Sequence, residues 1–349
     1  MSARAVSGEG ELVGTGAVRV PAAERLIEVD HLTVSFGKTL KALDDVSLSI
    51  IKGEIFALVG ESGCGKSTLA YALLDLVPPP GRVTGGEVRF KGRSYQQMSK
   101  RELNRVRAEQ VSMVFQGAMN AFNPVITIEA QVDHVLEAHP AVFRDRAEGR
   151  AYFEHLLELV RLPPARIRHM FESQLSGGMK QRVAIALALL LKPAVVVMDE
   201  PTTALDVLNQ RLVIDILYDL HETLGLTIVF VTHDLSVVAE LAERVAVLYA
   251  GRLVELGTVT EIFSSPRRHP YVVALVDAIP SVLDRGLKVR PVPGQVPNLA
   301  KLPPGCRFAP RCQLVEDICR HEEPMIVADE GGHQVACHVA NRSLGVTVP

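Results

Sequence analysis

The sequence predicts an α/β fold in which helices flank a parallel β-sheet. Two observations support this prediction. Apolar segments of strand length alternate with helical segments between residues 178 and 249, which is the pattern of a parallel sheet whose strands connect through helices. The apolar run Glu54–Gly60 also ends in glycine directly before a helical segment, as expected of a buried strand that leads into a tight turn.

Composition and charge exclude several classes of protein. The chain has 349 residues, of which 48% are hydrophobic and 22% charged, so we expect one large globular domain and a smaller one rather than a disordered chain. A net charge of −3 gives no support for nucleic-acid binding. The longest apolar runs, Ile185–Leu191 and Ala194–Met198, are shorter than the ~20 residues of a membrane-spanning helix. Membrane association is therefore expected to go through a partner.

The N-terminal part predicts a tail followed by strands. Residues 1–25 are rich in small residues and lack a basic start before an apolar core, so we expect a flexible tail and no signal peptide. The segment from Leu26 to about Leu48 predicts two antiparallel strands joined through residues 37–43. Lys66–Leu76 has a helical composition and is stopped by prolines. Further strands are predicted at Gly85–Gly92 and Val111–Gln116.

The second half of the chain predicts a helical insertion, an alternating core and a C-terminal extension. The insertion covers about residues 117–177, where four apolar residues follow the helical period, namely Phe153, Leu156, Leu157 and Val160. The alternating segments are helices at Gly178–Leu191, Leu208–Thr223 and Leu235–Glu243 and strands at Ala194–Met198, Thr227–Val231 and Val245–Tyr249. After about Phe263 proline, arginine and cysteine increase. We therefore expect a large domain over 26–262 and a small one over 263–349.

A glycine-rich loop, GESGCGKST at Gly60–Thr68, lies between a predicted strand and a predicted helix. Glycines let such a loop curl so that its amides point at phosphate oxygens, and the helix N-terminus favours their negative charge. Lysine adds a charge for the β- and γ-phosphates, and the following serine hydroxyl is placed to ligate Mg²⁺. We predict a nucleotide site formed by Gly60, Ser62, Gly63, Cys64, Gly65, Lys66, Ser67 and Thr68.

Two adjacent carboxylates, Asp199 and Glu200, end the apolar segment VVVMDEP. A buried strand would place Asp199 on the Mg²⁺ side and Glu200 beside the attacking water. The two residues are expected to have different roles because only one of them faces the metal.

The motif LSGGMKQR at Leu175–Arg182, together with the loop and the carboxylates, resembles the signature of ATP-binding cassette ATPases. The resemblance covers about residues 26–257 and implies a P-loop NTPase core with an antiparallel β subdomain and a helical subdomain. It implies catalytic roles for Glu200, His233 and Gln116, with Gln116 also near Mg²⁺. It also implies that Phe36 stacks on adenine and that Asp206 communicates between two nucleotide sites. The residues after Gln116 depart from the Asp-Pro that is frequent in the family.

The signature has its own physical logic. Ser176, Gly177 and Gly178 precede a predicted helix, so their free amides and the serine hydroxyl form a second anion site. In the family this site faces a γ-phosphate held by another subunit. The resemblance therefore implies that ATP joins two cassettes and that hydrolysis releases them.

Cys64, inside the phosphate loop, has two interpretations. The helix N-terminus would lower the pKa of its thiol and make it an oxidation site that ATP protects. The simpler interpretation is a small residue tolerated in the loop.

The C-terminal segment Ser264–Leu275, followed by PVPGQVPNL and GCRFAPRC, resembles the extension of oligopeptide and dipeptide importer ATPases. Four cysteines follow, with gaps of five, six and seventeen residues, at Cys306, Cys312, Cys319 and Cys337. Zinc sites usually contain cysteine pairs two to four residues apart. The resemblance to the dipeptide branch implies a [4Fe–4S] cluster, while zinc and disulfides or free thiols remain alternatives.

The resemblance as a whole implies the ATPase subunit of a peptide importer at the cytoplasmic face of the cell membrane. Its expected partners are a second cassette, which we expect to be a paralogue, two permeases and an extracytoplasmic binding protein. Alternatives are the same ATPase with nickel chelates, glutathione or sugars as cargo, a soluble cassette ATPase of DNA repair or translation, and an inactive regulatory cassette. The repair enzymes carry a long coiled coil before the signature, whereas here only 110 residues separate Lys66 from Ser176.

Overall fold

The computed structural model describes residues 25–37, 39–117, 122–203, 205–279, 292 and 294–344. The predicted tail lies outside these residues except for Arg25, which begins the first strand. The strands are β1 (Arg25–Phe36), β2 (Leu40–Ile51), β3 (Ile55–Val59), β4 (Gly81–Phe90), β5 (Arg93–Ser94), β6 (Val111–Val114), β7 (Val195–Asp199), β8 (Thr227–Thr232), β9 (Arg244–Tyr249), β10 (Arg252–Thr258), β11 (Val327–Ala328) and β12 (Gln334–Val335).

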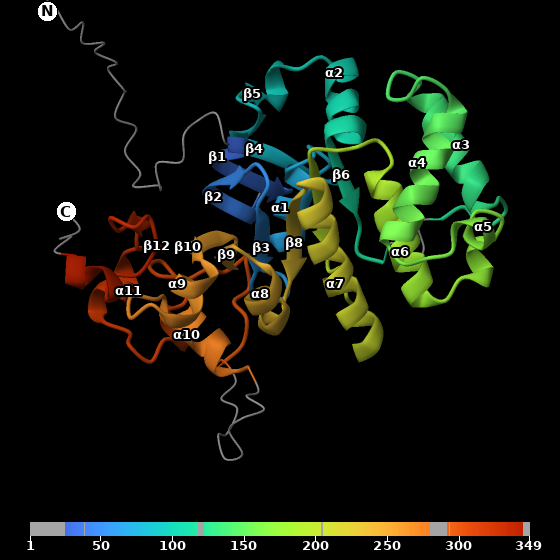
Figure 1. Cartoon of the computed structure of the whole chain (residues 1–349). Coiled ribbons are helices and arrows are strands. Elements are labelled where there is room, and N and C mark those ends of the chain that lie inside the picture. The colour runs from blue at the N-terminus through green and yellow to red at the C-terminus, as the bar shows by residue number, and fades with distance from the viewer. Residues whose placement is uncertain are drawn as a thin grey trace, which may run out of the picture.

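The helices flank these strands (Figure 1). They are α1 (Lys66–Ala72), α2 (Lys100–Arg105), α3 (Ile128–Ala138), α4 (Arg146–Leu159), α5 (Pro164–Ile167), α6 (Gly177–Leu189), α7 (Val207–Leu224), α8 (Leu235–Leu241), α9 (Val259–Ser264), α10 (Pro270–Asp277) and α11 (Asp317–His321). Short helical turns occur at Tyr95–Gln97, Val106–Gln110, Glu172–Gln174, Ala309–Arg311 and Ala340–Leu344.

The main sheet has the strand order β11-β12-β10-β9-β3-β8-β7-β6. Its strands β9, β3, β8, β7 and β6 run parallel, as the alternating pattern predicts. All residues of β3, β7 and β8 are buried, because helices α6, α7 and α8 cover one face of the sheet, and α1 with strands of a second sheet covers the other. Burial on both faces favours apolar residues on each. Parallel strands end at one edge, so the segments that follow β3, β6, β7 and β8 meet there.

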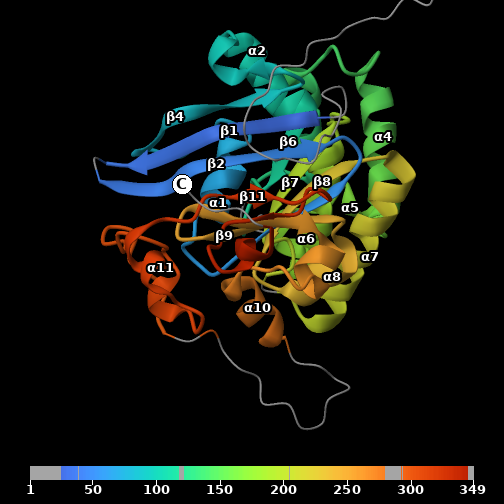
Figure 2. The same cartoon turned by 90° about the vertical axis from the view of Figure 1, so that its left-hand side faces the viewer.

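A second, antiparallel sheet has the order β2-β1-β4-β5 and packs above the main sheet (Figure 2). The predicted pairing of two strands after Leu26 is confirmed, but their connection is shorter than expected. Phe36 pairs with Leu40, so residues 40–43 belong to β2 rather than to the turn. The strand β4 begins at Gly81 and pairs along β1.

The helices α3, α4 and α5 lie at one end of the molecule (Figure 1). The four apolar residues with helical period pack into its core, since Phe153, Leu156, Leu157 and Val160 are all at most 2% exposed. The signature helix α6 packs against α4 and against β6. The apolar period therefore identified the face of α4 that anchors this part to the sheet.

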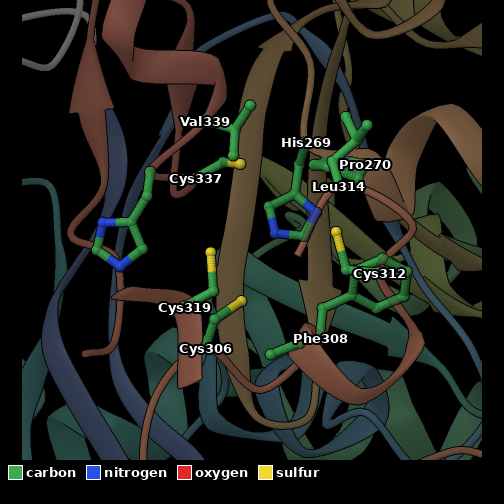
Figure 3. A pocket seen from close by; sticks show the side chains of 11 residues that line it. His269, Pro270, Cys306, Phe308, Cys312, Leu314, Cys319, Cys337 and Val339 are labelled. Atoms are coloured by element: carbon green, nitrogen blue, oxygen red, sulfur yellow. The ribbon is translucent and has the colours of Figure 1, made fainter. Parts of the chain in front are cut away.

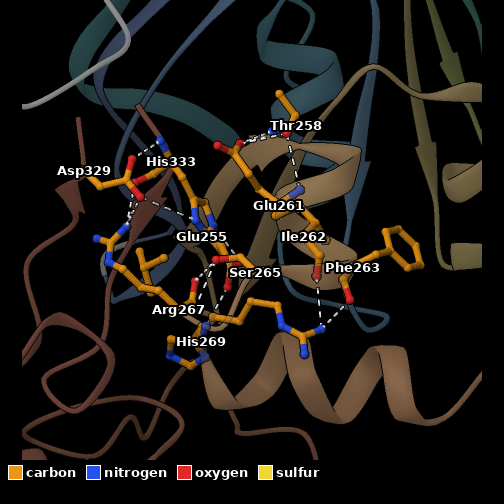
Figure 4. Close-up of polar contacts among 12 residues, drawn as sticks. Glu255, Thr258, Glu261, Ile262, Phe263, Ser265, Arg267, His269, Asp329 and His333 are labelled. Atoms are coloured by element: carbon orange, nitrogen blue, oxygen red, sulfur yellow. Dashed lines mark hydrogen bonds and ion pairs between the residues drawn. The ribbon is translucent and has the colours of Figure 1, made fainter. Parts of the chain in front are cut away.

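The C-terminal extension lies at the opposite end from α3–α5 and continues the main sheet (Figure 1). Glu255 of β10 pairs with Val335 of β12. Glu255 is completely buried, and its carboxylate accepts from His333 Nε2 at 2.9 Å and from the His269 amide at 2.6 Å (Figure 4). The nearby Arg267 guanidinium donates to the carbonyls of His333 and Val327. The extension is thus joined to the rest of the main sheet through strand pairing and buried polar contacts.

Candidate functional site

The phosphate loop follows β3 and turns at glycines that no other residue could replace. Gly60 has φ 146°, and a Cβ there would lie 2.3 Å from the Leu248 carbonyl oxygen. Gly65 has φ 110°, and its Cβ would lie 2.6 Å from the Ala42 carbonyl oxygen. Backbone therefore approaches backbone at both positions, which only glycine permits.

Lys66 begins α1 and is held close to the loop. Its Nζ donates to the carbonyl oxygens of Gly60 at 2.7 Å and Glu61 at 3.0 Å. Only 6% of the residue is exposed. The ammonium charge is thus fixed beneath the curled backbone, where a phosphate chain would lie in a loop of this kind.

Ser67 and Asp199 meet at the carboxyl edge of the sheet. The serine Oγ donates to Asp199 Oδ1 at 3.2 Å. Burial raises the pKa of Asp199, and the hydrogen bond from Ser67 opposes that rise. The other carboxylate oxygen, Oδ2, is buried and has no hydrogen-bond partner among the described residues. A hydroxyl beside an unsatisfied carboxylate oxygen is a donor set that fits Mg²⁺.

Gln116, the third predicted magnesium residue, contacts neither Ser67 nor Asp199 through a hydrogen bond in the described part of the chain. Its Nε2 instead donates to Glu200 Oε2 at 2.9 Å. Thr203 Oγ1 donates to the same oxygen at 2.8 Å, and His233 Nδ1 lies 3.2 Å from Glu200 Oε1. Two segments distant in sequence, those of Gln116 and His233, therefore converge on the Glu200 carboxylate, together with the nearby Thr203.

The backbone separates the two adjacent carboxylates. Asp199 is the last residue of β7, whereas Glu200 has a left-handed φ of 50° and its amide donates to the Val231 carbonyl. This turn directs the Glu200 side chain toward Gln116 and His233. Burial raises the pKa of Glu200, but hydrogen bonds from Thr203 and His233 outweigh it and hold the pKa below its ordinary value. Glu200 is thus ionised at neutral pH, as a proton acceptor must be.

The signature residues begin α6. Ser176 is the N-cap, and its hydroxyl accepts from the Met179 amide at 3.3 Å. A Cβ on Gly178 would lie 2.4 Å from Asn209 Oδ1. Asn209 in turn donates to both carboxylate oxygens of Asp206, the N-cap of α7, at 2.9 and 2.6 Å. The signature and Asp206 are therefore packed together through Asn209.

The predicted residues fall into separate groups. Within the described residues no hydrogen bond or ion pair joins Ser176, Gly177 or Gly178 to the phosphate loop. Phe36 lies at the end of β1, opposite Gly81 of β4. In the part of the chain that the structure describes, the phosphate loop and the signature segment are thus two groups that no hydrogen bond or ion pair joins directly.

Cys64 is 1% exposed and lies 3.9 Å from Lys66 Nζ. Burial raises the pKa of its thiol more than Lys66 lowers it. The environment is therefore the opposite of the one that would make Cys64 a reactive thiolate, which supports the interpretation of a small buried residue.

The four C-terminal cysteines line one small pocket (Figure 3), together with His269, Phe308 and His338. All four are free thiols, and the Cys306 amide donates to the Cys319 carbonyl at 2.9 Å. Burial, with a smaller contribution from neighbouring cysteines, raises the pKa of Cys306 to about 12. Even so, the described residues contain no group of three or more ligating side chains close enough to hold a single metal ion. The four thiols therefore share one pocket, but within the described residues they do not form a coordination site for a single ion.

Sequence reasoning missed several residues of the site. Thr203 follows Glu200 by three positions in PTT, and Asn209 follows Asp206 by three in a pattern typical of a helix N-cap, so both had a local signal. Glu61 and Arg311 form a bidentate ion pair across 250 residues, for which no local pattern exists.

Among the residues that the structure describes, no helix is both long and apolar enough to span a bilayer.

Comparison with known proteins gives two family matches. Residues 43–203 match the ABC transporter family, and residues 254–319 match the oligopeptide/dipeptide transporter C-terminal region. The chain is 43% identical to the dipeptide transport ATP-binding protein DppD of Caldanaerobacter subterraneus subsp. tengcongensis, over 86% of this chain and 92% of that protein. It is 40% identical to the oligopeptide transport ATP-binding protein OppD of Salmonella typhimurium, over 86% of this chain and 90% of that protein.

Solved structures match the cassette part. The dimeric bacterial ABC transporter cassette MJ0796 aligns with a TM-score of 0.58 and 31% identity, over 67% of this chain and 99% of that one. The cbiO1 subunit from Clostridium perfringens, part of the transporter complex cbiONQ, aligns with a TM-score of 0.61 and 26% identity, over 69% of this chain and 91% of that one.

Proposed function

The chain belongs to the ATP-binding cassette family of transporter ATPases, and from this premise we propose that it is the ATP-hydrolysing subunit of a di- or oligopeptide importer. The observation that carries the proposal is the convergence of Gln116 and His233 on Glu200, beside the Ser67–Asp199 pair. The relatives that it matches over most of its length are named for dipeptide and oligopeptide transport.

In the proposed reaction, Glu200 accepts a proton from the water that attacks the γ-phosphorus, and the bond from that phosphorus to the bridging oxygen breaks to give ADP and phosphate. His233, which lies 3.2 Å from Glu200 Oε1, is proposed to orient the carboxylate and to contact the γ-phosphate. Mg²⁺, when bound at Ser67 and Asp199, supplies positive charge to the β- and γ-phosphate oxygens. Phe36 is the proposed adenine contact.

The separation of the phosphate loop from the signature supports a pair of cassettes. Ser176, Gly177 and Gly178 lie at the start of α6, where backbone amides have no partner within the helix, and among the described residues no hydrogen bond or ion pair joins them to the phosphate loop. Beside Asp206, the side chains of Val207 and Leu208 are 77% and 83% exposed, which favours burial against a partner. We propose that a second cassette, a paralogue of this chain, covers this surface and completes each ATP site.

A surface for the permeases is proposed near Gln116. Phe115 is 40% exposed and Val125 76% exposed, on either side of the segment that follows β6. Since Gln116 also contacts Glu200, a partner seated here could sense the catalytic carboxylate. We propose that the chain lies at the cytoplasmic face of the cell membrane, and that an extracytoplasmic protein delivers cargo to the permeases.

The test of the function is reconstitution of the complete transporter in liposomes with ATP and candidate peptides. We expect peptide-stimulated ATP hydrolysis that the matched Glu200→Gln complex lacks. Stimulation by a nickel chelate, glutathione or a sugar, with none by peptides, would overturn the cargo while leaving the ATPase assignment intact.

The four cysteines are proposed to hold a [4Fe–4S] cluster that stabilises the extension. The support is that all four thiols line one pocket, since cysteine thiolates are the ligands that hold such clusters. Anaerobic purification followed by iron, sulfide and zinc analysis tests this, and zinc without iron or sulfide would refute it.

A further inference from the structure

Glu61, the second residue of the phosphate loop, is contacted by three side chains. Its amide donates to Tyr271 Oη at 2.8 Å. Its carbonyl accepts from Lys66 Nζ at 3.0 Å. Its carboxylate receives two hydrogen bonds from Arg311, with Nη1 at 2.6 Å from Oε2 and Nη2 at 2.9 Å from Oε1. Two of these three groups belong to the C-terminal extension.

Arg311 is held in place by burial and by several contacts, so it can fix the position of Glu61. Its side chain is 5% exposed, against 23% for Glu61, and Nη1 also donates to Tyr249 Oη at 3.2 Å. The guanidinium carbon lies 5.7 Å from the Tyr249 ring and 5.8 Å from the Phe308 ring. A bidentate pair between a planar guanidinium and a carboxylate sets orientation as well as distance.

Tyr271 packs against the same two aromatic rings, those of Tyr249 and Phe308. It is fully buried, with ring centroids 4.6 Å from Tyr249 and 5.5 Å from Phe308. Tyr249 ends β9 of the cassette, whereas Tyr271 and Phe308 come from the extension. The first turn of α10 is fixed by His269, whose Nδ1 accepts from the Tyr271 amide at 3.1 Å. The hydroxyl that meets Glu61 therefore has little freedom to move.

A separate contact attaches the same segment of the extension to the cassette without touching the phosphate loop. Arg307 donates to the Ala250 carbonyl at 2.6 Å, to Glu323 at 2.9 Å and to Asp44. The segment from Cys306 to Cys312 thus carries two arginines with different targets. Only Arg311 reaches the phosphate loop.

We propose that Arg311 and Tyr271 are positioning residues for the nucleotide site: they fix the Glu61 peptide, and through its carbonyl the Lys66 ammonium, so that the extension sets the affinity of the phosphate loop for ATP. The proposal rests on the role of this loop in ATP binding. It assigns to the extension an effect on the ATPase core itself, in addition to any effect on cargo or cluster.

The alternative is that these contacts only hold the extension in place, as those of Arg307 do. The two cases predict changes in different measured quantities. A positioning role changes the ATP dissociation constant and KM, whereas a purely structural role lowers thermal stability and leaves ATP affinity unchanged in the folded protein.

The experiment uses the full-length chain in its transporter complex and compares Arg311→Met, Tyr271→Phe and Glu61→Gln with Arg307→Met as the matched control. ATP affinity, KM, kcat and Tm are measured for each. We expect the first three variants to weaken ATP binding by roughly tenfold, the ratio that corresponds to about 1.4 kcal/mol, with kcat changed less than KM. Arg307→Met is expected to lower Tm without changing ATP affinity.

A double variant tests whether the pair acts as a unit. If it does, Arg311→Met combined with Glu61→Gln weakens ATP binding no more than either single change. Unchanged ATP affinity in folded Tyr271→Phe and Glu61→Gln overturns the proposal, and so does an equal loss of affinity in Arg307→Met. Because Tyr271→Phe removes only a hydroxyl, it decides the matter even where Arg311→Met fails to fold. Absence of ATP binding in the wild-type complex would instead refute the proposed function.

Discussion

Glu200 Oε1 lies 3.2 Å from His233 Nδ1, although the two residues directly follow different strands of the parallel sheet. Gln116, after a third strand, donates to the second oxygen of the same carboxylate at 2.9 Å. A carboxylate oriented on both oxygens and kept ionised by its partners is suited to accept a proton from water.

The first prediction concerns the charge of Glu200. Glu200→Gln keeps the size of the side chain and removes the proton acceptor, so steady-state ATP hydrolysis should fall by about 10²–10⁴-fold while ATP still binds. Nucleotide binding and phosphate release measure the two effects. As a control, Thr203→Val removes one hydrogen bond to the carboxylate and should reduce turnover by less than about tenfold. Near-normal turnover in Glu200→Gln would contradict the assignment.

A second prediction follows from the buried carboxyl of Asp199. Burial raises its folded-state pKa, so the folded chain holds the proton more tightly than the unfolded chain, and ionisation at neutral pH costs stability. Asp199→Asn should therefore raise the Tm of the magnesium-free protein. It should also abolish the further rise in Tm that Mg²⁺ with ATP gives the wild type. As a control, Asp215→Asn changes a half-buried carboxylate that pairs with Arg211 and should do neither. A magnesium response that survives in Asp199→Asn would count against the site.

The contact between Gly178 and Asn209 gives a third prediction. A methyl group on Gly178 would lie 2.4 Å from Asn209 Oδ1, so Gly178→Ala should displace α6 from α7 and reduce ATP hydrolysis by the complex. ATP binding at the phosphate loop should persist, because that loop lies elsewhere in the chain. Adding Asn209→Ala makes room for the methyl group and should restore part of the activity. If the double variant is as inactive as Gly178→Ala, crowding is not the cause.

A fourth prediction concerns the pair formed by Glu255 and His333. Their side chains are 0% and 1% exposed, and they meet at 2.9 Å. His333→Ala leaves the buried carboxylate without one partner, which should cost about 3–5 kcal/mol of unfolding free energy. Denaturant unfolding measures this cost. His321→Ala, from an exposed pair with Asp317 at 3.7 Å, should cost less than about 1 kcal/mol. Equal effects of the two changes would show that burial does not decide the strength of the pair.

The parallel strands could be predicted because burial on both faces leaves continuous apolar runs, as in β7 and β8. The strand β10 was missed, since its sequence RLVELGT places Glu255 among apolar residues. That glutamate is compatible with a buried strand only because His333 and the His269 amide, distant in sequence, satisfy it. The helix α2 was also missed, although Ser99 and Glu102 form a capping box that marks its start.

The residues of the candidate site could be proposed from the sequence one by one, because each lies after a predicted strand or near the start of a predicted helix in a recognisable motif. The contacts among these residues were harder to predict from the sequence. Gln116 was expected beside Mg²⁺, yet its amide is bonded to Glu200, because the left-handed turn at Glu200 brings that carboxylate toward Gln116. The contact from Arg311 to Glu61 depends on how the extension folds back over β9, and no local pattern encodes that path.

The pairing of β12 with β10 also prevents other molecules from pairing with the edge of β10. Without it, the seven-residue strand β10 would be the edge of the main sheet, and five of its residues, Leu253–Gly257, are buried in the folded chain. Long apolar edge strands recruit strands from other molecules. The sheet instead ends in β11, which has only two residues and both half-buried. The extension thus guards against edge-to-edge aggregation, and a chain truncated before β11 would expose a template for it.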